Sequence, residues 1–283
     1  MTSSPAKEAN RLSKMLDAFH AVHGGERFPV DVCKLALECG NFFNFPDLIT
    51  SVQGADIDGF DGGLFRKGNE WLLLFNNSLP SEGRIRFTQA HELGHYLLHR
   101  ATKEMFQCGD IGLATESEKS TELEADKFAA YLLMPLNDFR AQLSSTVDLK
   151  VLGDCAERYG VSLTATIHQW LNSTEEKAVL VVSRDGYMLS AKASDSAHKA
   201  GAFFRTRRET IEVPPGSLAA NPTITSEKQG QLLPAKVWFP DASPGTLLRE
   251  MKLVSDTYDT VLTLLVLPST EDVWTPRFAG ASD

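Results

Sequence analysis

The sequence predicts an α+β fold. A mainly helical domain with a small antiparallel sheet comes first, a helix-turn-helix-like segment follows, and a small α/β domain comes last. Two observations support this prediction. Apolar residues recur at helical spacing in residues 81–100 and 119–133, whereas residues 50–77 alternate and carry glycine, as short strands do. With 283 residues, of which 42% are hydrophobic, the chain is large enough for two or three compact units.

The first domain is expected over residues 1–136. Two amphipathic helices are predicted at its start, from Lys7 to about His23 and from Val30 to about Glu38. The strands of residues 50–77 and the two helices named above complete it. Met134-Pro135 is expected to end the second of those helices, because proline disfavours a helical conformation in the residue before it.

Residues 137–172 are expected to form a helical segment that packs on the first domain. Within it, residues 149–171 show two helical stretches joined at Tyr159-Gly160-Val161-Ser162, the pattern of a helix-turn-helix. A DNA-reading helix carries basic side chains for phosphates, but residues 163–171 contain neither Lys nor Arg. The segment is therefore predicted to have a structural or partner-docking role.

A smaller domain is predicted over residues 177–283, after a polar linker at residues 172–176. Ala178–Ser183, followed by Arg184-Asp185-Gly186, predicts a strand and a hairpin. Further elements are expected as follows: strands at Val237–Phe239 and Val261–Leu267, a helix at Gly245–Ser255, and a long loop from Val213 to Gly230.

Charge and cysteine content narrow the class of protein. The formal net charge is −9, and basic and acidic side chains balance in residues 177–283, so the excess lies in residues 1–176. An acidic first half favours a basic partner such as a DNA-binding protein, although solubility alone explains such a charge equally well. No segment is long enough to span a membrane, and residues 1–5 lack the apolar core of a signal peptide. A cytoplasmic location is expected, and the unpaired spacing of the cysteines fits it: Cys33, Cys39, Cys108 and Cys155.

His91-Glu92-Leu93-Gly94-His95 is the most informative motif. It lies in a stretch that is predicted to be helical, and residues four apart share one face of a helix. The imidazoles of His91 and His95 can therefore bind one metal ion from adjacent turns, while Glu92 can take a proton from a water at the metal. The spacing predicts a zinc hydrolase with Glu92 as the general base. The alternative is a helix with two surface histidines.

A catalytic zinc site usually has three protein ligands and a water, so a third ligand is needed. Leu98 stands where a metzincin has the glycine that precedes its third histidine, and His99 comes too early, which excludes that arrangement. The helix predicted at residues 119–133 offers carboxylates instead.

Glu122 and Asp126 share one face of that second helix, while Glu124 lies on the other side, with Lys127 as its expected ion-pair partner. Glu122 is therefore the predicted third ligand. Asp126 is predicted to accept the free ring N–H of a ligand histidine and so to fix its tautomer. The alternative for both is a solvated acidic helix start, which the helix dipole favours.

Two segments, Arg86–His99 with the histidine motif and Glu122–Pro135, closely resemble the ImmA/IrrE family of bacterial metallopeptidases. The preceding segments Asp58–Leu64 and Trp71–Asn76 are similar to the hairpin before that family's active-site helix. The resemblance implies a zincin-like domain with zinc on His91, His95 and Glu122 and with Glu92 as the base.

Asp126 departs from this pattern, because the family usually has asparagine there. Family members cut DNA-binding repressors. The resemblance therefore implies a helix-turn-helix repressor as substrate and a stress, DNA-damage or mobile-element and phage-defence response as the output. Residues 177–283 are similar in layout to the GAF-like sensor domain of the IrrE branch.

Cys108 is the first of two features that predict regulation. It lies in Met105–Gly112, between the two ligand-bearing helices, which brings this loop near the metal. A thiolate there can fill the open position of zinc and hold the enzyme off, and the glycines would let the loop swing away. The alternative is a small hydrophobic residue in a loop.

The second feature is the segment Phe203-Phe204-Arg205-Thr206-Arg207-Arg208. Arg205, Arg207 and Arg208, interleaved with Phe203 and Phe204, suit single-stranded DNA, because arginine neutralises phosphate and aromatic rings stack on bases. The alternative is a strand with two core phenylalanines and exposed arginines. The alternative activator predicted for this C-terminal domain is a small molecule.

The histidine motif predicts a zinc hydrolase, and the resemblance to ImmA/IrrE proteins implies a cytoplasmic endopeptidase that cuts a repressor at one exposed site. The alternative is a non-catalytic metal-binding regulatory protein that docks to a transcription factor. A closed site in which Cys108 is a permanent fourth ligand would favour this alternative, whereas Glu92 argues against it, because a structural site needs no base.

Overall fold

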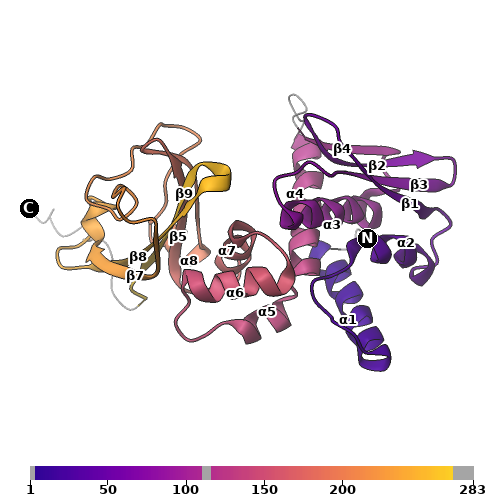
Figure 1. The fold of residues 1–283 in the computed structure, drawn as a ribbon, viewed down its shortest axis with the longest axis horizontal. Helices are drawn as coiled ribbons and strands as arrows, with labels where there is room; N and C mark the ends of the chain where they lie inside the picture. Colours follow the sequence, from indigo (N-terminus) through magenta and orange to yellow (C-terminus); the bar gives the residue numbers. More distant parts are fainter. Residues whose placement is uncertain (1–3, 110–115, 270–283) are drawn as a thin grey trace, which may run out of the picture. The chain divides into compact units, whose positions relative to one another are not determined.

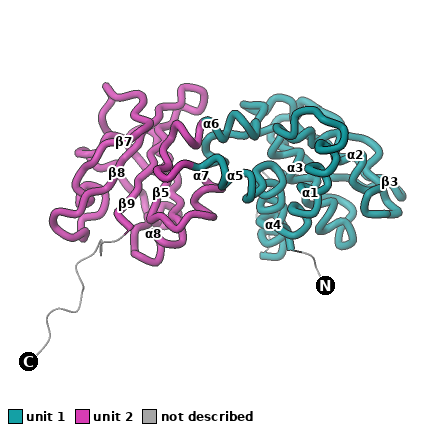
Figure 2. The backbone as a smooth tube through the Cα atoms, turned by 90° about the horizontal axis from the view of Figure 1, so that it is seen from below, with its two compact units in different colours: residues 1–143, 154–166 teal, residues 144–153, 167–283 magenta. Residues whose placement is uncertain are grey.

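The computed structural model of the protein describes residues 4–109 and 116–269, which form two compact units. Within these residues, the first unit comprises 4–109, 116–143 and 154–166, and the second comprises 144–153 and 167–269 (Figure 2). The division passes within α6 (Leu149–Tyr159) and α7 (Leu163–Leu171). The three domains expected over 1–136, 137–172 and 177–283 stay predictions.

The first unit contains a four-stranded sheet in the order β1-β3-β2-β4. Its strands are β1 (Leu48–Ala55), β2 (Phe60–Lys67), β3 (Glu70–Asn76) and β4 (Met105–Gly109). β2 is antiparallel to β3 and β4, but β1 is parallel to β3. The sheet is mixed, so the prediction of an antiparallel sheet is wrong for β1. Alternation of apolar and polar residues indicates the buried face of a strand, and it does not fix the direction of the neighbouring strand.

Helix α3 (Glu82–His99) is the central element of this unit. It lies against β2 and β3, and α4 (Glu116–Leu133) packs against it (Figure 1). The hydroxyl of Ser81 caps its start and accepts a hydrogen bond from the amide of Arg84 at 3.2 Å. Every residue from Thr88 to Leu97 is buried, so the histidine motif lies inside the unit and not on a surface face.

The remaining helices of the N-terminal part lie close to their predicted positions. α1 (Pro5–His23) packs on α4, and α2 (Val32–Phe42) packs on β1. α4 ends at Leu133, directly before Met134-Pro135, as predicted. α5 (Leu136–Gln142) follows, and the turn between α6 and α7 falls at the predicted place. Gly160 adopts a φ of 59° there, a backbone conformation that favours glycine.

The second unit contains a five-stranded antiparallel sheet in the order β6-β5-β9-β8-β7. The predicted hairpin is confirmed, with Asp185 and Gly186 both at positive φ in a two-residue turn. Apart from parts of α6 and α7, the described helical elements of this unit are short. The strands and helical elements are β5 (Lys177–Arg184), β6 (Tyr187–Ala193), α8 (Asp195–Lys199), β7 (Ser226–Pro234), η1 (Ala235–Val237), β8 (Leu247–Ser255), η2 (Asp256–Tyr258) and β9 (Thr260–Leu267).

Two predictions for this unit are wrong. The helix expected at 245–255 is strand β8, which pairs with β7 on one side and β9 on the other. The strand expected at 237–239 is the end of the 3₁₀ turn η1 and the residues after it, where Trp238 and Phe239 are both buried. The strand expected at 261–267 is confirmed as β9, and residues 213–225 of the expected long loop contain no helix or strand.

A membrane-spanning segment was not expected. None of the helices in the described ranges combines the length and the apolar character needed to cross a bilayer.

Candidate metal centre

The two motif histidines point their Nε2 atoms at a common point. His91 and His95 lie one turn apart on α3, and their side chains are 9% and 0% exposed. Their Nε2 atoms are 3.0 Å apart. Each Nδ1 atom is occupied by another side chain, so the tautomer that leaves Nε2 free for a metal is favoured.

Glu122 reaches the same point from α4. Its Oε2 lies 3.1 Å from His91 Nε2, and its Oε1 lies 3.4 Å from His95 Nε2. Gly94 makes this approach of the two helices feasible, because a Cβ atom there would lie 3.0 Å from the ring of Phe128 and 3.2 Å from Ala125 Cα. The structure thus brings together the predicted ligands from both helices.

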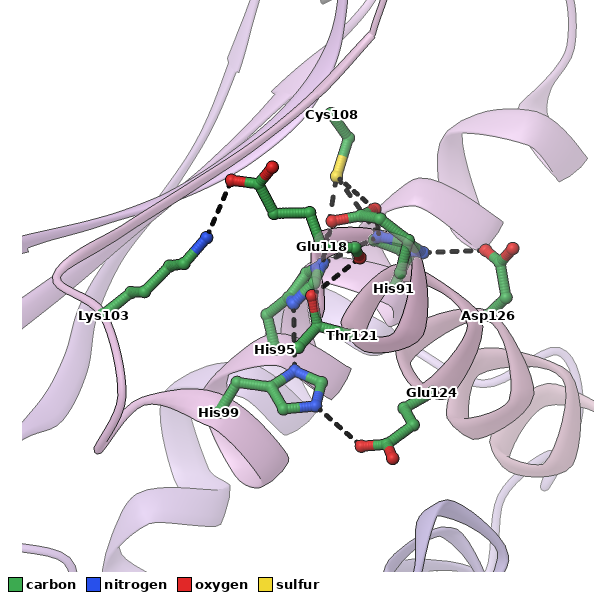
Figure 3. Close-up of polar contacts among 10 residues, drawn as sticks. His91, His95, His99, Lys103, Cys108, Glu118, Thr121, Glu124 and Asp126 are labelled. Atoms are coloured by element: carbon green, nitrogen blue, oxygen red, sulfur yellow. Dashed lines mark hydrogen bonds and ion pairs between the residues drawn. The ribbon is translucent and has the colours of Figure 1, made fainter. Parts of the chain in front are cut away.

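Cys108 supplies a fourth donor, but from a strand and not from the expected free loop. Its Sγ lies 3.2 Å from His91 Nε2 and 4.0 Å from His95 Nε2 (Figure 3). The same Sγ lies 3.4 Å from Glu122 Oε2. The residue belongs to β4 and is in register with Gly62 of β2. The expectation of a loop that glycines let swing is therefore wrong for Cys108 itself. The last predicted loop residues, 110–112, lie outside the described residues.

Hydrogen bonds behind the histidines hold both rings in place. Asp126 Oδ1 lies 2.9 Å from His91 Nδ1, which places this carboxylate where the sequence predicted it. His99 lies behind the other ligand, with its Nδ1 3.1 Å from His95 Nδ1, and Glu124 Oε2 lies 3.0 Å from His99 Nε2 (Figure 3). Such partners orient metal-binding imidazoles.

The sequence prediction missed His99 and Glu124. Glu124 was assigned to an ion pair with Lys127, whereas it contacts His99. The spacing carried a usable signal, because His91, His95 and His99 recur every four residues and so share one helix face.

Glu92 lies within the unit with no hydrogen-bond partner for either carboxylate oxygen, and it is 0% exposed. Gly62 makes room for it, because a Cβ atom at Gly62 would lie 2.9 Å from Glu92 Oε1. A buried carboxylate without a partner is costly, and such groups occur where function requires them. Glu92 is therefore placed beside the donor cluster as a carboxylate that is free to accept a proton.

The ionisation of these groups follows from burial and from their neighbours. Burial raises the pKa of Glu92 to about 7, although nearby His91 opposes the rise. Burial lowers the pKa of His95 to about 4 and raises the pKa of Cys108 to about 12. Burial also disfavours the charged form of Glu122, but hydrogen bonds with His91 and His95 outweigh it and hold the pKa of that carboxyl well below its usual range.

The donor set fits a zinc ion. Ligand atoms around a tetrahedral zinc lie about 3.3–3.6 Å apart, because the bonds are about 2.0–2.3 Å long. The donor atoms of His91, His95, Cys108 and Glu122 all lie within 4.8 Å of one another, so their spacing is compatible with one shared ion. Imidazole, carboxylate and thiolate are also the ligands that zinc binds in proteins.

Residues 47–171 match the sequence model of the Peptidase M78 family, which is described as the IrrE N-terminal-like domain. The matched segment is less than half of the chain, and it includes Glu92 and all four donors. A search of curated proteins found no match. The family match supports the resemblance to ImmA/IrrE proteins and suggests a metallopeptidase-type function for the matched segment. The match ends at Leu171, directly before the predicted linker.

The residues predicted to bind nucleic acid lie in the other unit, between α8 and β7. Phe204 stacks on Phe239 at 5.1 Å between ring centroids and packs against the buried core, which leaves it unsuited to base stacking. Phe203 stacks on His198, and its ring lies 5.6 Å from the guanidinium of Arg205. Arg205, Arg207 and Arg208 are exposed. The nucleic-acid prediction is untested and now rests on Phe203 and the three arginines.

Proposed function

We propose that this protein is a zinc-dependent endopeptidase that cuts a DNA-binding, helix-turn-helix repressor in the cytoplasm. The observation that carries the proposal is the convergence of His91, His95 and Glu122 beside the buried, unpartnered carboxylate of Glu92. Two imidazoles, a carboxylate and an adjacent base make up the ligand set and base of a zinc hydrolase. The four cysteines are free thiols, which supports the cytoplasmic assignment.

His91, His95 and Glu122 would hold the zinc ion, which when bound supplies the Lewis acidity for water activation and carbonyl polarisation. Glu92 accepts the proton of the attacking water and passes it to the leaving amine. Burial raises the pKa of Glu92 to about 7, which suits a general base at neutral pH. Asp126 and the His99–Glu124 pair hold the two imidazoles in the orientation that directs Nε2 to the ion.

The substrate class is the finer part of the proposal. The resemblance to ImmA/IrrE proteins supports a DNA-binding repressor, and removal of that repressor would switch on a stress, DNA-damage or mobile-element response. The net charge of −9 also supports a basic partner, since it lies within residues 1–176. We propose further that the C-terminal unit is a GAF-like sensor that responds to single-stranded DNA or a small molecule.

A non-catalytic regulatory protein is the second candidate function. The observation that favours it is the fourth donor, because a site closed by Cys108 resembles a structural zinc site. In that case the protein would act by docking to a transcription factor, and Glu92 would be dispensable.

The two candidates are separated by Glu92→Gln. Wild type and variant are incubated with purified helix-turn-helix repressors of the same organism, and fragments are identified by mass spectrometry. We expect the variant to retain zinc and fold and to lose cleavage, because its amide cannot accept the proton. Cleavage by Glu92→Gln at a rate near that of wild type would refute the proposed mechanism, and intact repressor with both proteins would favour the docking candidate.

A further inference from the structure

A hydrolytic zinc site needs a position for water, and in this centre a thiol lies there. Three of the four donor atoms come from the two packed helices, and they account for the ligands of a catalytic site. The fourth, Cys108 Sγ, lies 3.2–4.0 Å from the imidazole nitrogens and 3.4 Å from Glu122 Oε2. These separations are compatible with a thiol that binds the same ion as the other donors.

Strand β4 fixes the direction of this thiol. The register of β2 and β4 shifts between Phe60 and Gly62, so one extra residue of β2 lies opposite the Cys108–Gly109 end of β4. Bulges of this kind re-aim side chains near active sites. Two positions before Cys108, and therefore on the same face of the strand, Phe106 stacks on His95 with ring centroids 4.6 Å apart. The sheet therefore holds the thiol in a fixed direction, toward the other donor atoms.

The same strand lies at an edge of the sheet, so it can detach without breaking the pairing of the other strands. β4 is an edge strand of the order β1-β3-β2-β4, and within the described residues its strand partner is β2. The irregular pairing at Cys108 weakens its last part, whereas Phe106 is buried and anchors the preceding residues. Opening of the Cys108 end would therefore leave His91, His95 and Glu122 in place.

We propose that Cys108 is a fourth, displaceable zinc ligand that keeps the proposed endopeptidase latent. The inference rests on the proposed function. The thiol gives up its proton to solvent as it binds the ion, and in this state the water position is occupied. Hydrolysis requires the Cys108 end of β4 to move away, after which Glu92 faces an ion with three protein ligands.

Cobalt(II) in place of zinc provides a direct test, because a thiolate ligand gives Co²⁺ a charge-transfer absorption band in the near ultraviolet. Wild type, Cys108→Ala and Cys33→Ala are each loaded with Co²⁺. Cys33 is a matched control, since it is a partly buried cysteine on α2 and not one of the cluster's donors. We expect the band in wild type and in Cys33→Ala, and its loss in Cys108→Ala with Co²⁺ still bound.

Latency is tested in the same samples with acetohydroxamate, a small chelator that needs the open position. If the thiolate occupies that position at least about nine-tenths of the time, removal of the thiolate tightens acetohydroxamate binding at least about tenfold. We expect this gain in Cys108→Ala and not in Cys33→Ala.

Bound Co²⁺ with no thiolate band in wild type, or equal acetohydroxamate affinity in all three proteins, would overturn the latency proposal and leave the proposed function standing. Loss of Co²⁺ from Cys108→Ala would also overturn it, because an inhibitory ligand is dispensable for metal binding. Failure of all three proteins to bind Co²⁺ or Zn²⁺ would instead refute the proposed function.

Discussion

Glu122 and Glu124 are two positions apart on α4, and the structure gives them different tasks. Glu122 contacts both motif histidines, whereas Glu124 contacts His99, which lies behind His95. The two residues therefore allow a comparison between the proposed direct ligand and a carboxylate that would act through another side chain.

Glu122→Gln is expected to weaken zinc binding by more than about 100-fold, because a charged ligand is lost. Glu124→Gln is expected to weaken it by about tenfold or less, since the change acts through His99 and His95. Competition with a chelator of known affinity measures both values. Equal losses, or a greater loss in Glu124→Gln, would reverse the assignment of the third ligand.

For single residues, the sequence predicted the position correctly where the spacing along a helix matched the requirements of a metal site. His91, Glu92, His95, Glu122 and Asp126 all lie where their helix positions predict. The role of His99 was missed because its contact with His95 depends on which side of α3 is covered, and residues 88–97 of this helix are buried on every side. The partner of Glu124 was misassigned for a related reason. An i,i+3 neighbour is one option on an exposed helix, and a tertiary contact replaced it.

The close approach of α3 and α4 depends on Gly94, so the metal centre depends on a contact between elements. A Cβ atom at this position would meet the backbone of Ala125, which cannot move like a flexible side chain. Any larger residue must separate the helix that carries the histidines from the helix that carries Glu122.

Gly94→Leu is expected to destabilise the protein by about 1–3 kcal/mol through overpacking and to weaken zinc binding at least about tenfold. Gly153→Ala is the control, because a Cβ atom at this other helical glycine meets nothing within 4 Å. The control is expected to be neutral or to gain up to about 1 kcal/mol. Urea unfolding and chelator competition measure the two effects, and unchanged zinc affinity in Gly94→Leu would contradict the packing argument.

The contact between α5 and α6 provides a test that does not involve the metal. Asp138 accepts two hydrogen bonds from Arg158, both at 2.9 Å, and one from the hydroxyl of Tyr159 at 2.6 Å. Burial opposes the charged form of Asp138, but these hydrogen bonds outweigh it and lower the pKa of the carboxyl.

Asp138→Asn is expected to cost about 1–3 kcal/mol at pH 7. A carboxyl with a lowered pKa stabilises the fold above its unfolded-state pKa of about 3.9, and this stabilisation is lost as pH falls through the folded-state value. The difference between wild type and Asp138→Asn should therefore shrink between pH 7 and pH 3, whereas exposed Glu157→Gln shows little difference at either pH. Urea unfolding at several pH values is the measurement, and a difference independent of pH would exclude this role.

Helices and strands were predicted well where the local order of apolar and polar residues decides the structure. They were predicted poorly where pairing with distant strands decides it. Leu247, Leu248 and Met251 have the i, i+1, i+4 spacing of a helix stripe, yet they lie on β8 because strands β7 and β9 pair with both of its sides. Glu250 and Lys252 are buried on that strand, and Glu250 accepts a hydrogen bond from the indole of Trp238 at 2.8 Å. Residues 245–255 taken alone show neither the neighbouring strands nor the tryptophan.

For the whole molecule, the sequence indicated a change of structure near residue 172, and the family match ends close to it. It gave no sign that residues 144–153 group with the C-terminal unit. That grouping includes a hydrogen bond of 2.6 Å from Arg249 Nη2 to the carbonyl of Val147, which are 102 positions apart. A contact over this distance along the chain leaves no local pattern in the sequence.

The central claim is that the protein hydrolyses peptide bonds with Glu92 as the base. The most direct test compares all protein N-termini in cells that produce wild type with those in cells that produce Glu92→Gln at equal abundance and zinc content, under the condition that activates the response. We expect a new N-terminus within a helix-turn-helix protein in wild type and its absence in Glu92→Gln. The same set of N-termini in both cells would contradict it.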